Sequence, residues 1–219
     1  NPAGITMSLE KRKAVLAVAK KYNVPILEDN PYGELRFAGT DIPTIKSMDD
    51  EGIVIYCGSF SKILSAGMRV GFLCGHKDLI QKIVVVKQTN DVHTNLFFQM
   101  LCSRFISEYG LDDHIAGIKK LYRDNCMTMI SEMDAKFPEN VKYTRPEGGL
   151  FLWVTMPDSV DINEFIKKTV AAEVAVVPGA TFLPDTGMVS HSFRMNYSMP
   201  TKDQIIKGVG ILADVMKNM

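Results

Sequence analysis

The sequence has no excess of charge of either sign, no long apolar run and no pair of closely spaced cysteines. Its 219 residues carry 25 basic and 25 acidic side chains, so the net charge is +0 at pH 7. A balanced charge creates no long-range field that would attract nucleic acid or an anionic membrane surface. No apolar run approaches the ~20 residues that a membrane-spanning helix needs. We therefore expect a soluble protein with neither a nucleic-acid nor a membrane partner.

Cysteine and histidine are both scarce and scattered. The sequence has 4 histidines without ligand spacing and 4 cysteines without a CxxC pair, namely Cys57, Cys74, Cys102 and Cys126. Isolated positions of this kind favour neither a disulfide scaffold nor a zinc site. We expect no bound metal, and free thiols that suit a reducing, cytoplasmic location.

The composition is that of a globular protein, with 46% hydrophobic and 23% charged residues. A helix-period segment, with its expected N-cap at Ser8, precedes short apolar runs without polar alternation at 24–27, 53–57 and 70–74. Such runs are typical of an α/β fold with a mostly parallel sheet buried on both faces. Polar residues that follow the strand ends are where such sheets bind ligands.

From residue 78 onward the pattern becomes helical. Helices are expected at 78–87, 95–108 and 111–136, and Phe137-Pro138 ends the last of them. Shorter strand-like and helical runs then alternate, at 141–144, 150–155, 162–172, 175–177, 192–198 and 202–217. We predict two domains, 1–110 and a small α+β domain at 111–219 that is entered through the long helix.

The segment GSFSKILSAGMRVGF at 58–72 places Lys62 close to two serines and an arginine. A lysine after a strand is usually a solvated surface residue. Here Ser59 and Ser61 offer hydroxyl groups, and Arg69 offers a planar fork that suits a phosphate. The P-loop order GxxxxGK[ST] is absent. The segment therefore indicates a lysine that attacks a carbonyl in a compound that also carries a phosphate.

Pyridoxal 5′-phosphate is such a compound, and it needs two further kinds of partner. Its ring nitrogen needs a carboxylate, and its phenolic oxygen needs hydrogen-bond donors. Asp29 and Tyr32, in EDNPY at the end of the preceding apolar run, supply both, and Asn1 of NPAG supplies a second donor. Taken alone, Asp29 is equally compatible with a turn cap, and Tyr32 with a half-buried ring.

The order of these motifs resembles that of the fold-type I, class I/II aminotransferases, the aspartate-aminotransferase-like superfamily. The closest likeness is to the 2-aminoadipate, kynurenine and aromatic aminotransferase branch, and to the aminotransferase-like domains of MocR-type regulators. The motifs that carry it are NPAG at 1–4, EDNPYGELRF at 28–37, GSFSKILSAGMRVGF at 58–72, RPEGGLFLW at 145–153, VVPGATF at 176–182 and FRMNYS at 193–198.

The resemblance implies roles for individual residues. Lys62 would be the Schiff-base lysine, and Asp29 the partner of the ring nitrogen. Tyr32 and Asn1 would hold the phenolic oxygen. The phosphate would be bound by Ser59, Ser61 and Arg69. The substrate α-carboxylate would be bound by Arg194, which alone reads equally well as an exposed arginine on an edge strand.

The resemblance also implies an activity and a larger protein. The expected reaction is transfer of an amino group from an α-amino acid to a 2-oxo acid, in a cytoplasmic homodimer. Residues 1–110 would be the C-terminal part of the cofactor-binding large domain. The opening NPAG suggests a fragment that lacks the front of the site and is weakly active at best. The alternatives are a non-catalytic sensing domain of a MocR-type regulator, and a fold-type I lyase or decarboxylase.

Overall fold

The computed structural model describes residues 1–185 and 187–219. It divides into two compact units, one formed by residues 7–118 and the other by residues 1–6 together with 119–219. The domain bounds 1–110 and 111–219 stay a sequence-based prediction, because the compact units are defined by contacts and not by independent folding.

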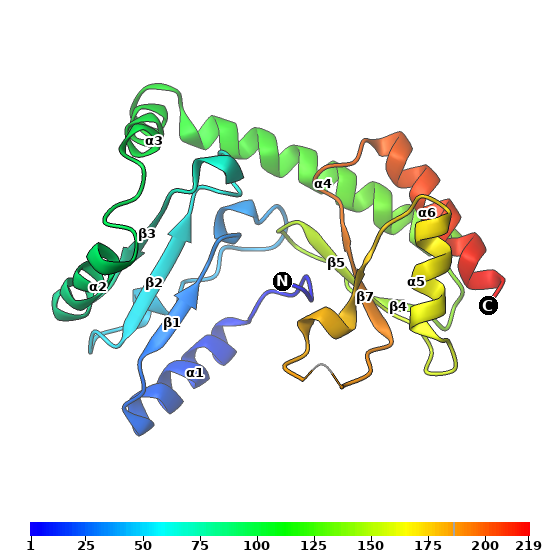
Figure 1. The fold of residues 1–219 in the computed structure, drawn as a ribbon, viewed down its shortest axis with the longest axis horizontal. Coiled ribbons are helices and arrows are strands. Elements are labelled where there is room, and N and C mark those ends of the chain that lie inside the picture. The colour runs from blue at the N-terminus through cyan, green and yellow to red at the C-terminus, as the bar shows by residue number, and fades with distance from the viewer. Residues whose placement is uncertain (186) are drawn as a thin grey trace. The chain divides into compact units, whose positions relative to one another are not determined.

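The first unit is a small sheet with helices around it (Figure 1). Helix α1 begins after its N-cap Ser8, whose hydroxyl oxygen accepts a hydrogen bond from Lys11 N at 3.3 Å, as the sequence predicted. The elements of the unit are α1 (Leu9–Tyr22), β1 (Ile26–Asp29), β2 (Val54–Ser59), β3 (Gly71–Cys74), α2 (Lys77–Asn90), α3 (Leu96–Glu108) and the first turns of α4 (Leu111–Lys136).

The sheet of the first unit has the strand order β1-β2-β3 among the described residues. Strand β1 runs parallel to β2, with Ile26 opposite Val54 and Asp29 opposite Cys57. Strand β3 runs antiparallel to β2. The α/β class is confirmed, and the third strand makes the sheet mixed, because an apolar run carries no information about the direction in which its strand will pair.

Two apolar clusters pack α1 against β2 and α3 against the β2–β3 connection. The first joins Leu16 of α1 to Ile45 and Val54. The second joins Cys102 of α3 to Met68 and Val70. The expectation that the strands are buried on both faces is wrong for β3, where every residue is exposed, and for β1, where Leu27 and Asp29 are exposed. The apolar pattern records the hydrophobicity of a strand and not what covers it.

The second unit is an antiparallel sheet covered by helices. Its described strands have the order β4-β5-β7-β6. Their bounds are β4 (Lys142–Tyr143), β5 (Phe151–Thr155), β6 (Val177–Pro178) and β7 (Ser192–Asn196), and the helices are the rest of α4, α5 (Ile162–Ala171) and α6 (Lys202–Lys217).

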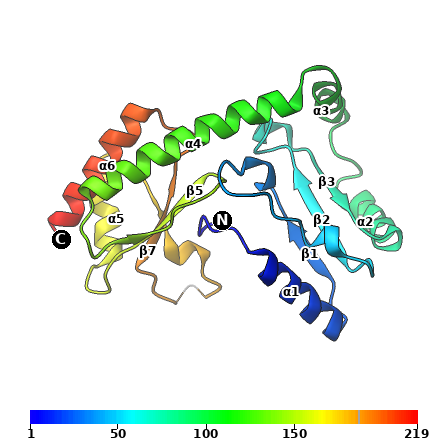
Figure 2. The ribbon, with the colours of Figure 1, turned by 180° about the vertical axis from the view of Figure 1, so that it is seen from behind.

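One face of this sheet packs against helices, and the other carries Arg194. Leu152 and Met195 are paired and buried, and the Phe193 ring lies 5.2 Å from that of Phe165 in α5. Figure 2 shows α5 and α6 on the same side of β5 and β7. Because side chains alternate along a strand, Arg194 points to the opposite face. That face carries the candidate site of this unit.

The helix termini and lengths follow the sequence closely. Helix α4 and helix α6 have the predicted bounds, and Asn95 caps α3 by accepting a hydrogen bond from Phe98 N. Thr201 and Gln204 form a reciprocal capping box at the start of α6. Within the described residues, none of the helices combines the length and the apolarity that a membrane crossing requires.

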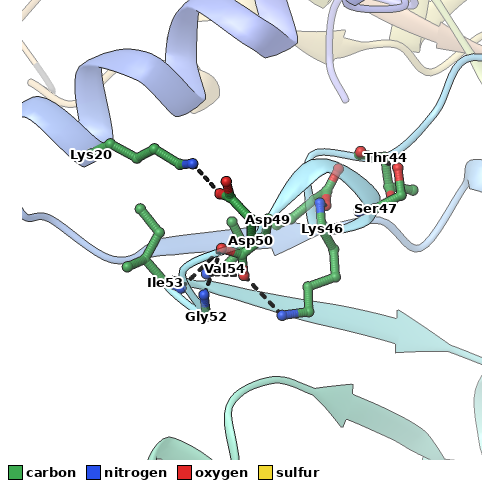
Figure 3. Close-up of polar contacts among 10 residues, drawn as sticks. Lys20, Thr44, Lys46, Ser47, Asp49, Asp50, Gly52, Ile53 and Val54 are labelled. Atoms are coloured by element: carbon green, nitrogen blue, oxygen red, sulfur yellow. Dashed lines mark hydrogen bonds and ion pairs between the residues drawn. The ribbon is translucent and has the colours of Figure 1, made fainter.

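A buried carboxylate organises the turn that leads into β2 (Figure 3). The Asp49 side chain is fully buried, and its two oxygens accept hydrogen bonds from the backbone N–H groups of Gly52, Ile53 and Val54 at 2.9, 3.1 and 2.9 Å. The Lys46 ammonium adds an ion pair at 2.9 Å. Burial alone would raise the pKa of Asp49, but the Lys46 ammonium and these backbone donors outweigh it and lower the pKa to about 2.

Asp49→Asn should therefore destabilise the protein at neutral pH by about 1–3 kcal/mol, because an amide cannot satisfy the same donors. Since the folded-state pKa of about 2 lies below the ordinary value of 3.8, the stabilisation is present above pH ~4 and is lost as the pH falls through 2. Urea unfolding at pH 7 and at pH 3 measures both effects. The control is Asp50→Asn, which removes an exposed carboxylate paired with Lys20 and should change little. Equal effects of the two substitutions would contradict the assignment.

Candidate functional site

One candidate site lies where β1 and β2 end. Parallel pairing places Asp29, the last residue of β1, opposite Cys57 of β2. Burial raises the pKa of the Cys57 thiol, and the charge of the Asp29 carboxylate raises it further. The acid predicted from EDNPY therefore lies at the same edge of the sheet as the start of the lysine segment.

Lys62 lies in a tight turn between β2 and β3. Ser61 N donates to Ser59 Oγ at 3.1 Å, and Leu64 N donates to the Phe60 carbonyl at 2.8 Å. Phe60 N donates to the Val70 carbonyl at 3.1 Å and closes the base of the turn. The Lys62 side chain is half-buried. These bonds fix the backbone on both sides of the lysine.

Arg69 lies at the far end of the same connection, just before β3. It adopts a left-handed backbone conformation with φ 54°, and its Nη1 donates to the Ala66 carbonyl at 3.1 Å. Gly71, two residues on, is the pairing partner of Ser59. The guanidinium-bearing residue and the hydroxyl-bearing residues therefore share one end of the β2–β3 connection, as an anion site requires.

The EDNPY segment is tied to β2 by its asparagine. Asn30 N donates to the Cys57 carbonyl at 3.0 Å, and Asn30 Nδ2 donates to the Tyr56 hydroxyl at 3.1 Å. Tyr32 follows, half-buried, and its carbonyl accepts from Leu35 N at 2.9 Å. The structure thus brings Asp29 and Tyr32 to the edge of the sheet from which the Lys62 turn departs.

A separate candidate site is built around Arg194 in the other unit. Its guanidinium lies over the Phe151 ring at 3.9 Å and near the Phe182 ring at 5.0 Å. Nη1 donates to Asn1 Oδ1 at 2.5 Å. Nε is buried and has no hydrogen-bond partner among the described residues. A buried donor of a charged group without a partner is costly unless an anion completes it.

The aromatic contacts of Arg194 are a part of the site that residue-by-residue reasoning missed. Phe151 belongs to RPEGGLFLW and Phe182 to VVPGATF, so both motifs were recognised, although neither ring was assigned a role. The two rings orient the guanidinium plane by cation–π contact. The only sign of these ring contacts in the sequence was the presence of phenylalanines in two of the family motifs.

NPAG is anchored in the same unit as Arg194. Gly4 has φ +62°, and a Cβ at this position would lie 2.5 Å from the Phe151 carbonyl oxygen. Only glycine allows this approach and this backbone conformation without strain. The close packing sets the position of Asn1, which was expected at the cofactor oxygen and here contacts Arg194.

The turn at Gly148 and Gly149 lies in this unit as well. Gly149 has φ 78°, and the Gly148 carbonyl accepts from the Tyr197 hydroxyl at 2.9 Å. These two glycines therefore form a structural turn that precedes Phe151 in β5.

A family model described as aminotransferase class I and II matches residues 1–210. Aromatic-amino-acid aminotransferase 1 from Thermococcus litoralis is 39% identical over 217 residues, which are 99% of this chain and 52% of that protein. The chain thus spans about half the length of the curated relatives it matches. A weaker likeness, at 26% identity, is to the HTH-type transcriptional regulator YisV of Bacillus subtilis, of which the chain covers 45%.

Solved structures of aminotransferases also match the whole chain. The kynurenine aminotransferase of Pyrococcus horikoshii, in complex with PMP, is 39% identical with a TM-score of 0.95, covering 100% of this chain and 54% of that chain. LysN, an α-aminoadipate aminotransferase of Thermus thermophilus complexed with N-(5′-phosphopyridoxyl)-L-leucine, is 32% identical with a TM-score of 0.94, covering 100% and 56%.

Gly4→Ala should destabilise the second unit by about 1–3 kcal/mol, because the new Cβ would clash with the Phe151 carbonyl at a positive φ. It should also displace Asn1 from Arg194. Chemical unfolding measures the first effect, and a crystal structure of the variant the second. The control is Gly208→Ala in α6, where no described atom outside the helix lies within 4 Å of the added Cβ. That control should be neutral or stabilising by up to about 1 kcal/mol; a G4A variant that behaves like it would contradict the packing argument.

Proposed function

We propose, since the chain belongs to the aminotransferase class I and II family, that the complete protein carrying it transfers amino groups from α-amino acids to 2-oxo acids. The motif-based resemblance to the 2-aminoadipate, kynurenine and aromatic aminotransferase branch is confirmed by the relatives. The cofactor of this family is pyridoxal 5′-phosphate, and both solved relatives contain a form of it. The observation that carries the proposal is the placement of Lys62 on a fixed turn at the edge where Asp29 ends β1.

The residues present fit this cofactor. An acid at the end of β1, an amine on the following turn, and hydroxyl and guanidinium groups on the same turn are the donor set that an aldehyde-bearing pyridine phosphate needs. Lys62 would hold its aldehyde, and Asp29 its ring nitrogen. The phosphate would be bound by Ser59, Ser61 and Arg69. Tyr32 and Asn1 are proposed for the phenolic oxygen, and no metal ion is part of the proposal.

The chemistry divides between the cofactor and the chain. When bound, the cofactor supplies an electron sink that stabilises negative charge at the substrate Cα. The Asp29 carboxylate keeps a proton on the ring nitrogen by accepting its hydrogen bond. Once the substrate amine had displaced it from the aldehyde, the free Lys62 amine would accept the proton from the substrate Cα as a general base and would then donate that proton as a general acid. The serine hydroxyls and Arg69 hold the phosphate and so fix the distance over which Lys62 moves that proton.

Arg194 is proposed to bind the substrate α-carboxylate. Its unpartnered Nε is the donor that a carboxylate would complete, and the Phe151 and Phe182 rings hold the guanidinium plane. A fork of two parallel N–H groups suits a carboxylate better than a point charge does. Arg194 recognises only the group that all α-amino acids share. The names of the relatives point to aromatic amino acids, kynurenine and 2-aminoadipate as the first substrates to test.

Location and assembly also belong to the proposal. The balance of 25 basic and 25 acidic side chains supports small-molecule substrates and no nucleic-acid partner, and the isolated cysteines support a cytoplasmic location. A homodimer is proposed from the family resemblance alone. Analytical ultracentrifugation tests the dimer. A half-reaction tests the regulator alternative, because conversion of bound cofactor to its amine form by an amino acid requires catalysis. Release of carbon dioxide or of a β-substituent would indicate a decarboxylase or a lyase instead.

Lys62→Ala should abolish the covalent attachment of the cofactor and lower kcat by about 10²–10⁴-fold, the usual contribution of a general acid–base. Reduction of the loaded protein with borohydride followed by peptide mapping should place the label on Lys62. The matched control is Lys77→Ala, at the start of α2, which should keep both the label and the activity. A label on any other lysine would refute the assignment.

Arg194→Lys should lower kcat/KM for amino acids by about 10–100-fold, because the charge remains and the planar fork and the ring contacts are lost. Steady-state kinetics measure this change. An amine that lacks the α-carboxylate should react equally well with both proteins. A variant that loses activity equally toward both kinds of amine would show that Arg194 does not read the carboxylate.

A further inference from the structure

We propose that His114 is a positioning residue for Lys62, holding the lysine turn through a hydrogen bond to the backbone next to it. His114 Nε2 lies 2.8 Å from the Ile63 carbonyl oxygen, although the two residues are 51 positions apart. Ile63 follows Lys62 directly. This inference rests on the proposed role of Lys62 and adds a residue that the motifs of the sequence do not include.

The chemistry of the contact fixes the direction of the bond. A carbonyl oxygen only accepts, so Nε2 of His114 must carry the proton. His114 therefore acts as the donor to the Ile63 carbonyl and constrains the turn.

The ring of His114 is itself held in place. It meets the Phe105 ring of α3 edge to face, with centroids 5.2 Å apart and an interplanar angle of 74°. The backbone N–H of His114 donates to the Gly110 carbonyl at 3.2 Å, which places the residue in the first turn of α4. The donor is therefore presented by the packing of two helices.

The bonds within the turn fix its local shape but do not tie it to the helices. They run from Leu64 N to Phe60 O, from Ser61 N to Ser59 Oγ and from Phe60 N to Val70 O, so they join residues of the β2–β3 connection to one another. Met68 and Val70 pack on Cys102 of α3, but apolar contacts have no direction. The hydrogen bond from His114 reaches the Ile63–Leu64 peptide, the second peptide unit after Lys62, and ties it to α4. It thereby limits the movement of the turn that carries the lysine. Misplacement of a reacting group by ~1 Å can cost about 10²-fold in rate.

Two substitutions of His114 separate the hydrogen bond from the packing. His114→Phe keeps a flat ring against Phe105 and removes the donor, whereas His114→Gln keeps a donor of similar reach. The control is His76→Phe, which removes the N-cap of α2, where Nδ1 accepts from Asp78 N two residues away. All variants are made in the complete protein.

The first measurement needs no bound cofactor. Amide hydrogen exchange of the peptide that covers residues 61–66 should become about tenfold faster in His114→Phe, the factor expected for losing one hydrogen bond of ordinary strength. It should stay near the wild-type rate in His114→Gln and in His76→Phe. Unchanged exchange in His114→Phe would overturn the inference.

The second measurement uses the loaded protein. In His114→Phe, the pH midpoint of the visible absorbance of the bound cofactor should shift, and kcat should fall about tenfold or more while KM changes little. His114→Gln should restore both. If Gln fails to rescue and both variants merely lose overall stability, His114 is structural and the inference is wrong. If borohydride labels another lysine, the proposed function fails first, and exchange at 61–66 still reports whether His114 holds the turn.

Discussion

The parallel pairing of β1 with β2 is the constraint that brings Asp29 and the Lys62 turn to one edge of the sheet. Parallel strands end at the same edge, so the register that sets Asp29 opposite Cys57 also brings the acid to the start of the Lys62 turn. A shift of one residue in this register would turn Asp29 to the other face of the sheet. The buried Asp49 carboxylate, which pairs with the backbone that enters β2, helps to fix where that strand begins.

The Lys62 turn and the surroundings of Arg194 are held by different interactions. Backbone hydrogen bonds hold the turn that carries Lys62. Arg194 has a buried Nε, and two aromatic rings hold its guanidinium. A preorganised, desolvated donor binds an arriving carboxylate more strongly than a hydrated one, because little reorganisation remains to be done.

Much of the fold was predictable because helical periodicity and capping are local. The bounds of α4 and α6 and the caps at Ser8 and Asn95 follow from nearby residues alone. The antiparallel direction of β3 was not predictable, since strand direction depends on the path of the chain between strands. The same limit applies to burial, because a strand cannot signal what will cover it.

In the candidate site, too, features that lie within a short segment were predictable, and contacts between distant residues were not. Lys62, Arg69 and Asp29 were predicted because their chemistry is concentrated in short segments, and their roles stay predictions. The contact of His114 with the Ile63 carbonyl could not be found in this way, because one partner is a backbone atom and every residue has one. A histidine without ligand spacing reads as a surface residue in the sequence. The contact appears only when α3 and α4 pack together and place the His114 ring beside the Ile63 carbonyl.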